Sequence, residues 1–158
     1  MSSSSVAVAA IFAAAALASV APAHTEGAID GDTIELNGTT FNLHGIDAAE
    51  FAQICADGWP AGYEARAYLA ALLDGRQVTC MAVPVADTKN AAICRADGVD
   101  LGAAMVTGGH AMAHVPFSAR YIAEEAAAAA AKRGLHAHNC APPWRWRARI
   151  DRPRGRER

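Results

Sequence analysis

The chain has 158 residues, of which 53% are hydrophobic, 6% aromatic and 19% charged. This length and composition fit one compact domain with a sizeable core and exclude two large domains. The formal net charge of −2 is unevenly spread, because residues 24–144 carry a net −7 and residues 145–158 a net +5. Nucleic-acid affinity rests largely on neutralising phosphates, so the acidic body excludes strong unaided binding of a polyanion. We expect any nucleic-acid binding to be weak and to depend on the arginine-rich C-terminal tail.

Residues 1–23 contain no charged side chain and run through an apolar stretch to Ala21, Pro22 and Ala23. The stretch is too short for a comfortable transmembrane span of ~20 residues, and the small side chains of Ala21 and Ala23 suit a signal peptidase. We therefore expect a signal peptide over residues 1–23, a periplasmic or secreted mature chain, and no stable membrane anchor after cleavage. The serine-rich start lacks the usual Lys or Arg, so an uncleaved anchor is the alternative.

Two segments with period-two alternation, 29–36 and 40–46, flank an Asn-Gly pair. Asn-Gly favours a type I′ turn because both residues accept positive φ, so the two segments predict a β-hairpin. In the second strand of this hairpin, Asn42 and His44 share the face opposite to Phe41.

Apolar residues at i, i+3 and i+4 predict an amphipathic helix after the hairpin, and Asp100 and Ser118 are candidate caps of two further helices. We expect strands at 77–83, 91–95 and 111–115, and helices at 62–73, 100–106 and 119–133. Residues 142–158 show no periodicity, so we expect a docked Trp segment and then a basic disordered tail over residues 148–158. Strands that dominate the first half and helices that dominate the second fit an α+β fold, a small closed β-barrel of OB type covered by helices.

Acidic residues flank the predicted hairpin, with Asp30 and Asp32 at its start and Asp47 and Glu50 after its second strand. The hairpin can bring Asp32, Asp47 and Glu50 to one end of the barrel. Three carboxylates there would suit a hard cation such as Ca²⁺, and a free carboxylate can orient a water for attack on phosphorus. In the alternative interpretation, Asp30 and Asp47 are turn residues and Glu50 is a solvated surface residue.

Seven short blocks, separated along the sequence, extend in order over nearly all of the mature chain. They are Ile29-Asp-Gly-Asp-Thr-Ile34, Gly45-Ile-Asp-Ala-Ala-Glu50, Gln53-x-Cys55, Asp100-Leu-Gly-Ala-Ala-Met-Val-x-Gly108, Tyr121-x-x-x-Glu125, Gly134-Leu135 and Pro143-Trp-x-Trp-Arg147. Together they resemble the staphylococcal nuclease (thermonuclease) family, in its secreted bacterial branch. The resemblance implies an OB-fold domain over residues 24–147, with a five-stranded barrel and about three helices. It also implies Ca²⁺-dependent hydrolysis of DNA and RNA phosphodiesters.

The resemblance also assigns roles to residues of the acidic group. Asp32 and Asp47 match the carboxylates that bind calcium, and Glu50 matches the proposed general base. Ala48 matches a position whose backbone carbonyl binds the metal in the family. The acidic half of the family's active site is therefore present in this sequence.

Two arginines that clamp the phosphate in the family are replaced. Asn42 stands at the first position and Lys89, within about one residue of register, at the second. Guanidinium groups stabilise the charge of a phosphorane better than an ammonium or an amide does, so we expect weak or absent nuclease activity. His44, Arg95 or the arginines of the tail could substitute, although the resemblance gives no precedent. The alternative function is a non-catalytic, envelope-side binding module that retains the OB fold.

Four cysteines in an exported chain favour disulfides over reduced core thiols. Cys80 and Cys94 lie in adjacent predicted strands, at positions where secreted members of the family often have cysteines, and we expect them to be joined. Cys55 lacks its family partner, because Ala61 stands in the corresponding Trp-Pro-Cys-Gly motif. Cys55 then either pairs with Cys140 or stays a free thiol.

The segment that contains His136, His138 and Cys140 alternates as three metal ligands on a strand would. A Zn²⁺ or Cu²⁺ site is therefore conceivable there. The resemblance favours altered packing instead, because it aligns His136 with a core tryptophan.

Overall fold

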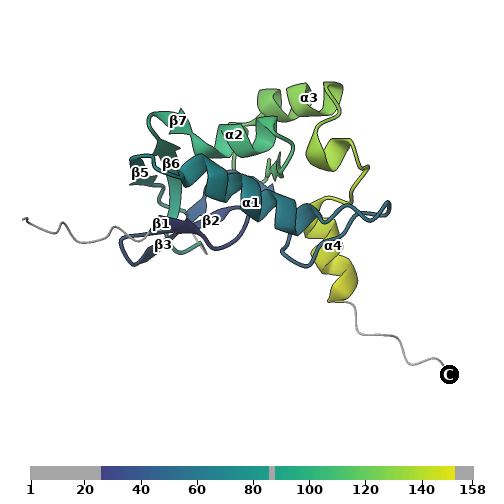
Figure 1. Ribbon diagram of the computed structural model, residues 1–158, viewed down its shortest axis with the longest axis horizontal. Coiled ribbons are helices and arrows are strands. Elements are labelled where there is room, and N and C mark those ends of the chain that lie inside the picture. The colour runs from purple at the N-terminus through teal and green to yellow at the C-terminus, as the bar shows by residue number, and fades with distance from the viewer. Residues whose placement is uncertain (1–25, 86–87, 152–158) are drawn as a thin grey trace, which may run out of the picture.

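The computed structural model describes residues 26–85 and 88–151 as a mixed α+β fold (Figure 1). The strands are β1 (Glu26–Ala28), β2 (Thr33–Leu36), β3 (Thr39–Leu43), β4 (Ile46–Ala48), β5 (Val78–Ala82), β6 (Ala91–Ala96), β7 (Val99–Asp100) and β8 (Ala111–Ala113). The helices are α1 (Ala61–Leu73), α2 (Leu101–Thr107), α3 (Ile122–Ala130) and α4 (Pro143–Ile150), with a 3₁₀ turn η1 (Gly134–His136). The predicted signal peptide, residues 1–23, lies outside the described residues.

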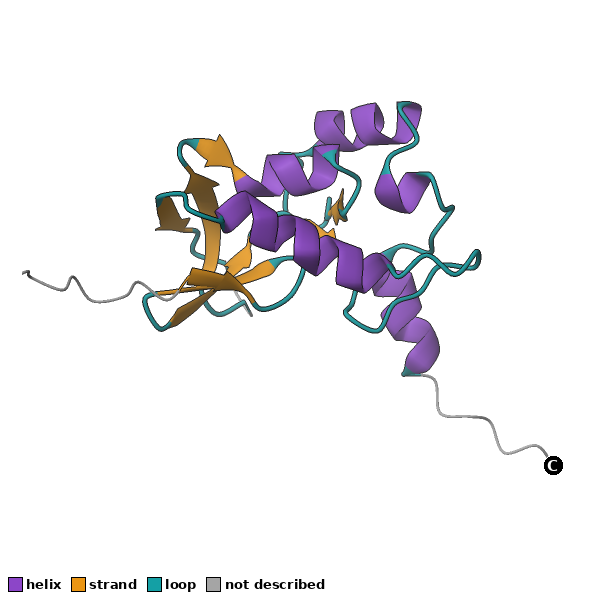
Figure 2. Ribbon diagram, viewed as in Figure 1, coloured by secondary structure: helices purple, strands orange, loops and turns teal. Residues whose placement is uncertain are grey.

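The larger sheet has the strand order β1-β2-β3-β6-β5, with β7 paired to β6, and β4 pairs with β8 in a separate two-stranded sheet. The β3 and β6 strands run parallel, whereas the other pairs are antiparallel. Figure 2 shows the larger sheet at one end of the molecule, α4 toward the other, and α1 running between them. The α+β class is confirmed. No closed barrel is assigned to the strands of residues 26–85 and 88–151, so the OB-type barrel stays a prediction.

The β2–β3 hairpin forms as the sequence predicts. Asn37 and Gly38 have φ values of 52° and 75°, and Leu36 pairs with Thr39 across the turn. These positive φ values are the ones that a type I′ turn requires. The register of the hairpin therefore determines which face of β3 carries the side chain of Asn42.

Helix α1 buries Ala65, Leu69 and Leu73 at helical spacing against the sheet side of the core. Its first turn lies directly against the loop that follows β4. A Cβ atom on Gly62 would collide with the backbone carbonyl of Glu50. The absence of a side chain at Gly62 therefore allows α1 to pack against the segment that carries Glu50.

Asp100 caps α2 as predicted, since its carboxylate accepts a hydrogen bond from the Ala103 N–H at 3.1 Å. It also accepts a hydrogen bond from the Tyr121 hydroxyl at 3.0 Å. The prediction for α3 is wrong at both ends, because the helix spans Ile122–Ala130 with Tyr121 as its N-cap. The Ser118 hydroxyl instead accepts a hydrogen bond from the Arg120 N–H, within the turn that precedes the helix.

The C-terminal segment differs most from the prediction. Residues 143–150 form helix α4, although the sequence shows no helical periodicity there, and residues 148–150 belong to this helix rather than to a disordered tail. The helix begins with Pro143, which is buried, and Trp144 packs against the core as the predicted docked Trp segment. Proline suits the first helical turn because its missing N–H would have no helical partner. Residues 152–158 of the predicted tail lie outside the described residues.

All four cysteines are paired. Cys80 and Cys94 face each other in the register of β5 and β6 and form the predicted disulfide. Cys55 is joined to Cys140, which resolves the alternative that the sequence leaves open. Among the residues that the structure describes, no helix is long and apolar enough to span a bilayer.

Candidate functional site

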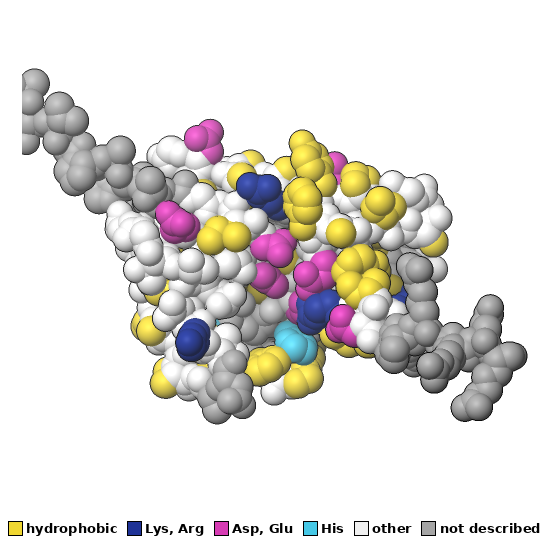
Figure 3. Space-filling model, turned by 90° about the horizontal axis from the view of Figure 1, so that it is seen from below, with side chains coloured by type: hydrophobic (Ala, Val, Ile, Leu, Met, Phe, Trp, Pro, Cys, Tyr) yellow, Lys and Arg dark blue, Asp and Glu magenta, His cyan; other side chains and the backbone are white. Residues whose placement is uncertain are grey.

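A hollow with a volume of about 370 Å³ lies where the ends of β3 and β4 meet α4. It brings together the three carboxylates that the sequence singles out, Asp32, Asp47 and Glu50. Its polar and aromatic lining residues are Asp32, Asn42, His44, Asp47, Glu50, Thr88, His114, Phe117 and Arg147. Figure 3 shows a face of the molecule on which acidic side chains gather around basic ones near the middle.

Asp32 is half-buried directly before β2. One carboxylate oxygen accepts a hydrogen bond from the Ala48 N–H at 3.0 Å, and the other accepts one from the Thr33 hydroxyl at 3.1 Å. Burial is the largest influence on this group and raises the pKa of Asp32 to about 6, against the opposing effect of these hydrogen bonds. Asp32 is therefore partly protonated in the folded protein at mildly acidic pH.

Asp47 and Glu50 share one guanidinium group. Arg147 forms a two-pronged ion pair with the buried Asp47, from Nη1 to Oδ1 at 2.9 Å and from Nη2 to Oδ2 at 2.7 Å. Its Nη1 also donates to Glu50 Oε1. The hydrogen bond to Asp47 is the largest cause of a raised pKa of the Arg147 guanidinium, which stays charged. Arg147 thus neutralises part of the acidic group.

The segment that leads into helix α4 is held in place, and the helix begins one turn before Arg147. The Cys55–Cys140 disulfide fixes the chain three residues before the helix begins. The buried Gln53 donates a hydrogen bond from Nε2 to the Ala141 carbonyl at 2.8 Å and accepts one at Oε1 from the Glu50 N–H at 3.3 Å. The same amide therefore connects the Glu50 loop to the lead-in of α4.

Aromatic stacking adds a second anchor for α4. Trp144 stacks on His114, with ring centroids 5.6 Å apart and an interplanar angle of 12°. His114 also contacts the exposed Phe117, at 4.6 Å between ring centroids. Because His114 and Phe117 both line the hollow, the anchor of α4 forms part of the wall of the site.

Asn42 occupies the wall of the hollow as the sequence predicts for its strand face, together with His44. Its side-chain NH₂ donates to the Lys89 carbonyl at 3.0 Å, and its oxygen lies 3.2 Å from the Thr33 hydroxyl, whose single proton is shared between Asn42 and Asp32. Lys89 is exposed and contributes its backbone to this contact, while Thr88 lines the hollow. The neutral amide of Asn42 therefore stands where the resemblance implies a guanidinium.

Arg147 is the residue that sequence reasoning did not single out. Of the proposed substitutes, Arg95 donates to the Gly98 carbonyl at 3.4 Å and lies 4.0 Å from Asp100, on β6 and away from the hollow. His44 does line the hollow. The place of Arg147 in the Pro-Trp-x-Trp-Arg block was the one sequence feature that pointed to this residue. Its partner Asp47 lies 100 residues away in the sequence, so no local pattern connects the two.

The donor set fits a hard cation by its chemistry, since Asp32 and Asp47 offer carboxylate oxygens and the acidic groups outnumber the guanidinium. Within residues 26–85 and 88–151, however, no three His, Cys, Asp or Glu side chains are arranged around a common metal position. Both oxygens of Asp47 are bound to Arg147 instead. Ala48, the third predicted metal-binding residue, is buried at the end of β4 with its N–H directed at Asp32. A cation at this site would have to share Asp47 with Arg147 or displace it.

The alternating His136, His138 and Cys140 do not form the strand that a metal site would need. Cys140 is in a disulfide, and His136 lies in a 3₁₀ turn. His138 stacks on Trp59 at 4.4 Å between ring centroids and forms a 2.7 Å hydrogen bond with the exposed Asp57. These side chains pack the disulfide loop rather than surround a metal.

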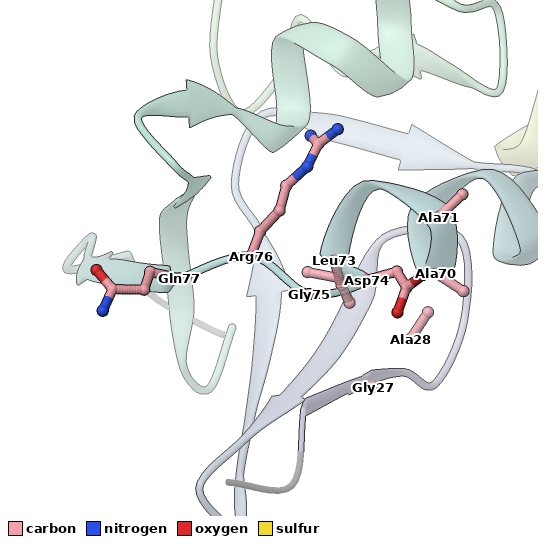
Figure 4. A pocket seen from close by; sticks show the side chains of 9 residues that line it. All are labelled: Gly27, Ala28, Ala70, Ala71, Leu73, Asp74, Gly75, Arg76 and Gln77. Atoms are coloured by element: carbon pink, nitrogen blue, oxygen red, sulfur yellow. The ribbon is translucent and has the colours of Figure 1, made fainter.

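A larger hollow of about 780 Å³ lies between β1 and the end of α1. Figure 4 shows that small side chains line most of it and that the side chain of Arg76 points away from Asp74. Its lining has no converging set of titratable groups. The chemistry-bearing residues are therefore concentrated in the smaller hollow.

No protein-family model matches the chain, and no curated protein matches it. The likeness to staphylococcal nucleases therefore rests on the sequence blocks alone. It enters the function as part of a proposal, beside the geometry of the site.

Proposed function

We propose that the chain is a secreted or periplasmic, thermonuclease-like phosphodiesterase with weak, Ca²⁺-dependent activity on DNA or RNA. The observation that carries the proposal is the convergence of Asp32, Asp47 and Glu50 in one hollow. The same three residues match the acidic half of the family's active site. Two disulfides are compatible with an exported protein, and the five strands of the β1-β2-β3-β6-β5 path are compatible with an OB-type barrel.

In this proposal, Asp32 and Asp47 hold the cation together with the backbone carbonyl of Ala48. When bound, Ca²⁺ supplies positive charge that offsets the charge of the phosphate oxygens. Glu50 accepts a proton from a water whose oxygen forms the new bond to phosphorus, while the bond from phosphorus to the leaving oxygen breaks. Glu50 is suited to this role because its side chain is partly exposed on the hollow, at 32%.

The activity is weak because the charge-stabilising half of the site is reduced. Asn42 offers a neutral amide that is already bonded to the Lys89 carbonyl and the Thr33 hydroxyl. Loss of one hydrogen-bond donor that stabilises the developing negative charge costs on the order of 2.7–4 kcal/mol, or 10²–10³ in rate. Arg147 is a guanidinium at the site, but it is engaged by Asp47 and Glu50.

Cleavage of a fluorescently labelled single-stranded DNA by the purified, oxidised chain tests the proposal. We expect slow cleavage with Ca²⁺, loss of cleavage with a chelator, and at least a hundredfold loss in Glu50→Gln. Asp74→Asn removes an exposed carboxylate remote from the hollow and should leave the rate unchanged. Cleavage that persists in Glu50→Gln or in chelator would contradict the assignment.

The second candidate is a non-catalytic, envelope-side binding module on the same fold. The observation that favours it is the Arg147 ion pair, which occupies both oxygens of Asp47. A binding module predicts no cleavage in the assay above at any calcium concentration. The proposed phosphodiesterase predicts measurable, chelator-sensitive turnover.

A further inference from the structure

Arg147 does not use all of its hydrogen-bonding capacity on the carboxylates. A guanidinium has five N–H donors, and Arg147 spends three of them, two on Asp47 and one on Glu50. Its side chain is 38% exposed and lines the hollow. The group is therefore charged, partly open to solvent and part of the wall of the hollow.

The charge balance of the hollow decides what Arg147 can do there. Asp32, Asp47 and Glu50 carry a formal charge of −3 when ionised, and Arg147 contributes +1. A phosphate group entering a site with a surplus of negative charge is repelled. A divalent cation on the carboxylates removes that surplus and competes with Arg147 for Asp47. The same event makes the site attractive to phosphate and frees the guanidinium.

We infer that Arg147 is a phosphate-binding residue. Its guanidinium leaves the carboxylates of Asp47 and Glu50 and binds a phosphate oxygen instead, and a hard cation on the carboxylates drives this exchange. The inference rests on the proposed function and assigns to α4 the phosphate contact that Asn42 cannot make. Cation and phosphate then bind cooperatively, because each takes one partner of an existing ion pair. In the absence of phosphate, Arg147 competes with the cation and weakens its binding.

The anchoring of α4 makes this exchange a side-chain movement. The disulfide at Cys140, the Gln53 bond to Ala141 and the stack of Trp144 on His114 hold the helix at its first turn. Arg147 lies one turn further along. A planar guanidinium matches phosphate oxygens as well as carboxylate oxygens, so the new contact needs no different chemistry.

Two titration calorimetry experiments on the full oxidised chain at pH 7.5 test the inference. The first titrates Ca²⁺ alone, and the second titrates adenosine 5′-monophosphate, which has no diester bond to hydrolyse, at saturating Ca²⁺. We expect Arg147→Gln to bind Ca²⁺ roughly tenfold more tightly than the wild type and the nucleotide at least tenfold more weakly. Arg149→Gln, an exposed arginine on the same helix, is the control and should change neither affinity.

Opposite changes in the two affinities distinguish an exchanging arginine from other roles. If Arg147→Gln weakens the binding of both Ca²⁺ and the nucleotide, Arg147 only supports the structure. If the nucleotide affinity of this variant is unchanged or rises, Arg147 only blocks the site. Either result overturns the inference, as does a wild type that binds neither probe. Arg147→Lys guards against misfolding, since it keeps the charge and should retain part of the nucleotide affinity. The readouts are independent of turnover, so a protein that shows the opposite changes without cleaving DNA refutes the proposed function and leaves the inference standing.

Discussion

Asp32 is the carboxylate of the hollow for which no ion pair is found within the described part of the chain. Burial, opposed by the hydrogen bonds from Ala48 and Thr33, raises its pKa from an ordinary 3.8 to about 6. The folded protein therefore binds the proton more tightly than the unfolded chain does. This contribution to stability is fully present below about pH 4 and is lost as the pH rises through 6. At about 1.4 kcal/mol per pKa unit, it amounts to roughly 3 kcal/mol.

Asp32→Asn should remove this pH dependence, because the amide stays neutral. We expect the free energy of unfolding of the variant, relative to the wild type, to rise by roughly 2–3 kcal/mol between pH 4 and pH 7.5. Urea denaturation across this range, with a chelator present, measures the difference. Parallel stability curves for the two proteins would show that Asp32 titrates normally.

The elements around the site differ in how far the sequence predicts them. The β2–β3 hairpin follows from the Asn37-Gly38 pair, and the Cys80–Cys94 disulfide joins neighbouring strands, so both are encoded by short-range patterns. Helix α4 was missed because its Trp and Arg residues follow two prolines without an apolar period, and contacts made in the folded state hold it. The Arg147 to Asp47 pair depends on that docking, and nothing local to either residue indicates it.

The two disulfides act on different elements and should be separable by experiment. Cys55–Cys140 closes a separation of 85 residues and Cys80–Cys94 one of 14. The chain-entropy model gives about 4.5 and about 3 kcal/mol for these loops. We therefore expect Cys55→Ala with Cys140→Ala to lower the melting temperature more than Cys80→Ala with Cys94→Ala.

Tryptophan fluorescence adds a readout that stability alone does not give. The Trp59 carbonyl accepts a hydrogen bond from the N–H of Cys55, at the Cys55–Cys140 disulfide, and Trp144 and Trp146 are on α4. We expect a red-shifted emission in the folded Cys55→Ala with Cys140→Ala variant and none in the Cys80→Ala with Cys94→Ala variant. Identical spectra in the two variants would mean that α4 docks without its disulfide.

At the scale of the whole molecule, the charge is divided between an acidic body and a basic C-terminus. Residues 152–158 contain four arginines and one glutamate. Their removal takes away a net three positive charges. The slope of log K against log salt for single-stranded DNA binding should therefore become shallower by about 2. Fluorescence anisotropy at several salt concentrations measures this slope. An unchanged slope would show that DNA contacts the body rather than the tail, and an unchanged melting temperature serves as the control for folding.

The α+β architecture and the gathering of Asp32, Asp47 and Glu50 could be predicted from the sequence because the hairpin sets their spacing. The ion pair with Arg147 could not, since it depends on how the last helix lies against the sheet. In the proposed function, one site has an intact acidic half and a weakened basic half.

The rate of single-stranded DNA cleavage by Asn42→Arg, compared with the wild type, tests this claim most directly. Asn42 lies on the wall of the hollow, and a guanidinium there adds the donor that the site lacks. We predict a Ca²⁺-dependent rate at least tenfold above that of the wild type, and a further rise when Lys89→Arg is added. Thr40→Arg places the same charge at an exposed position of the same strand and should leave the rate unchanged. A folded Asn42→Arg protein with no gain, or with a gain equal to that of Thr40→Arg, would contradict the account.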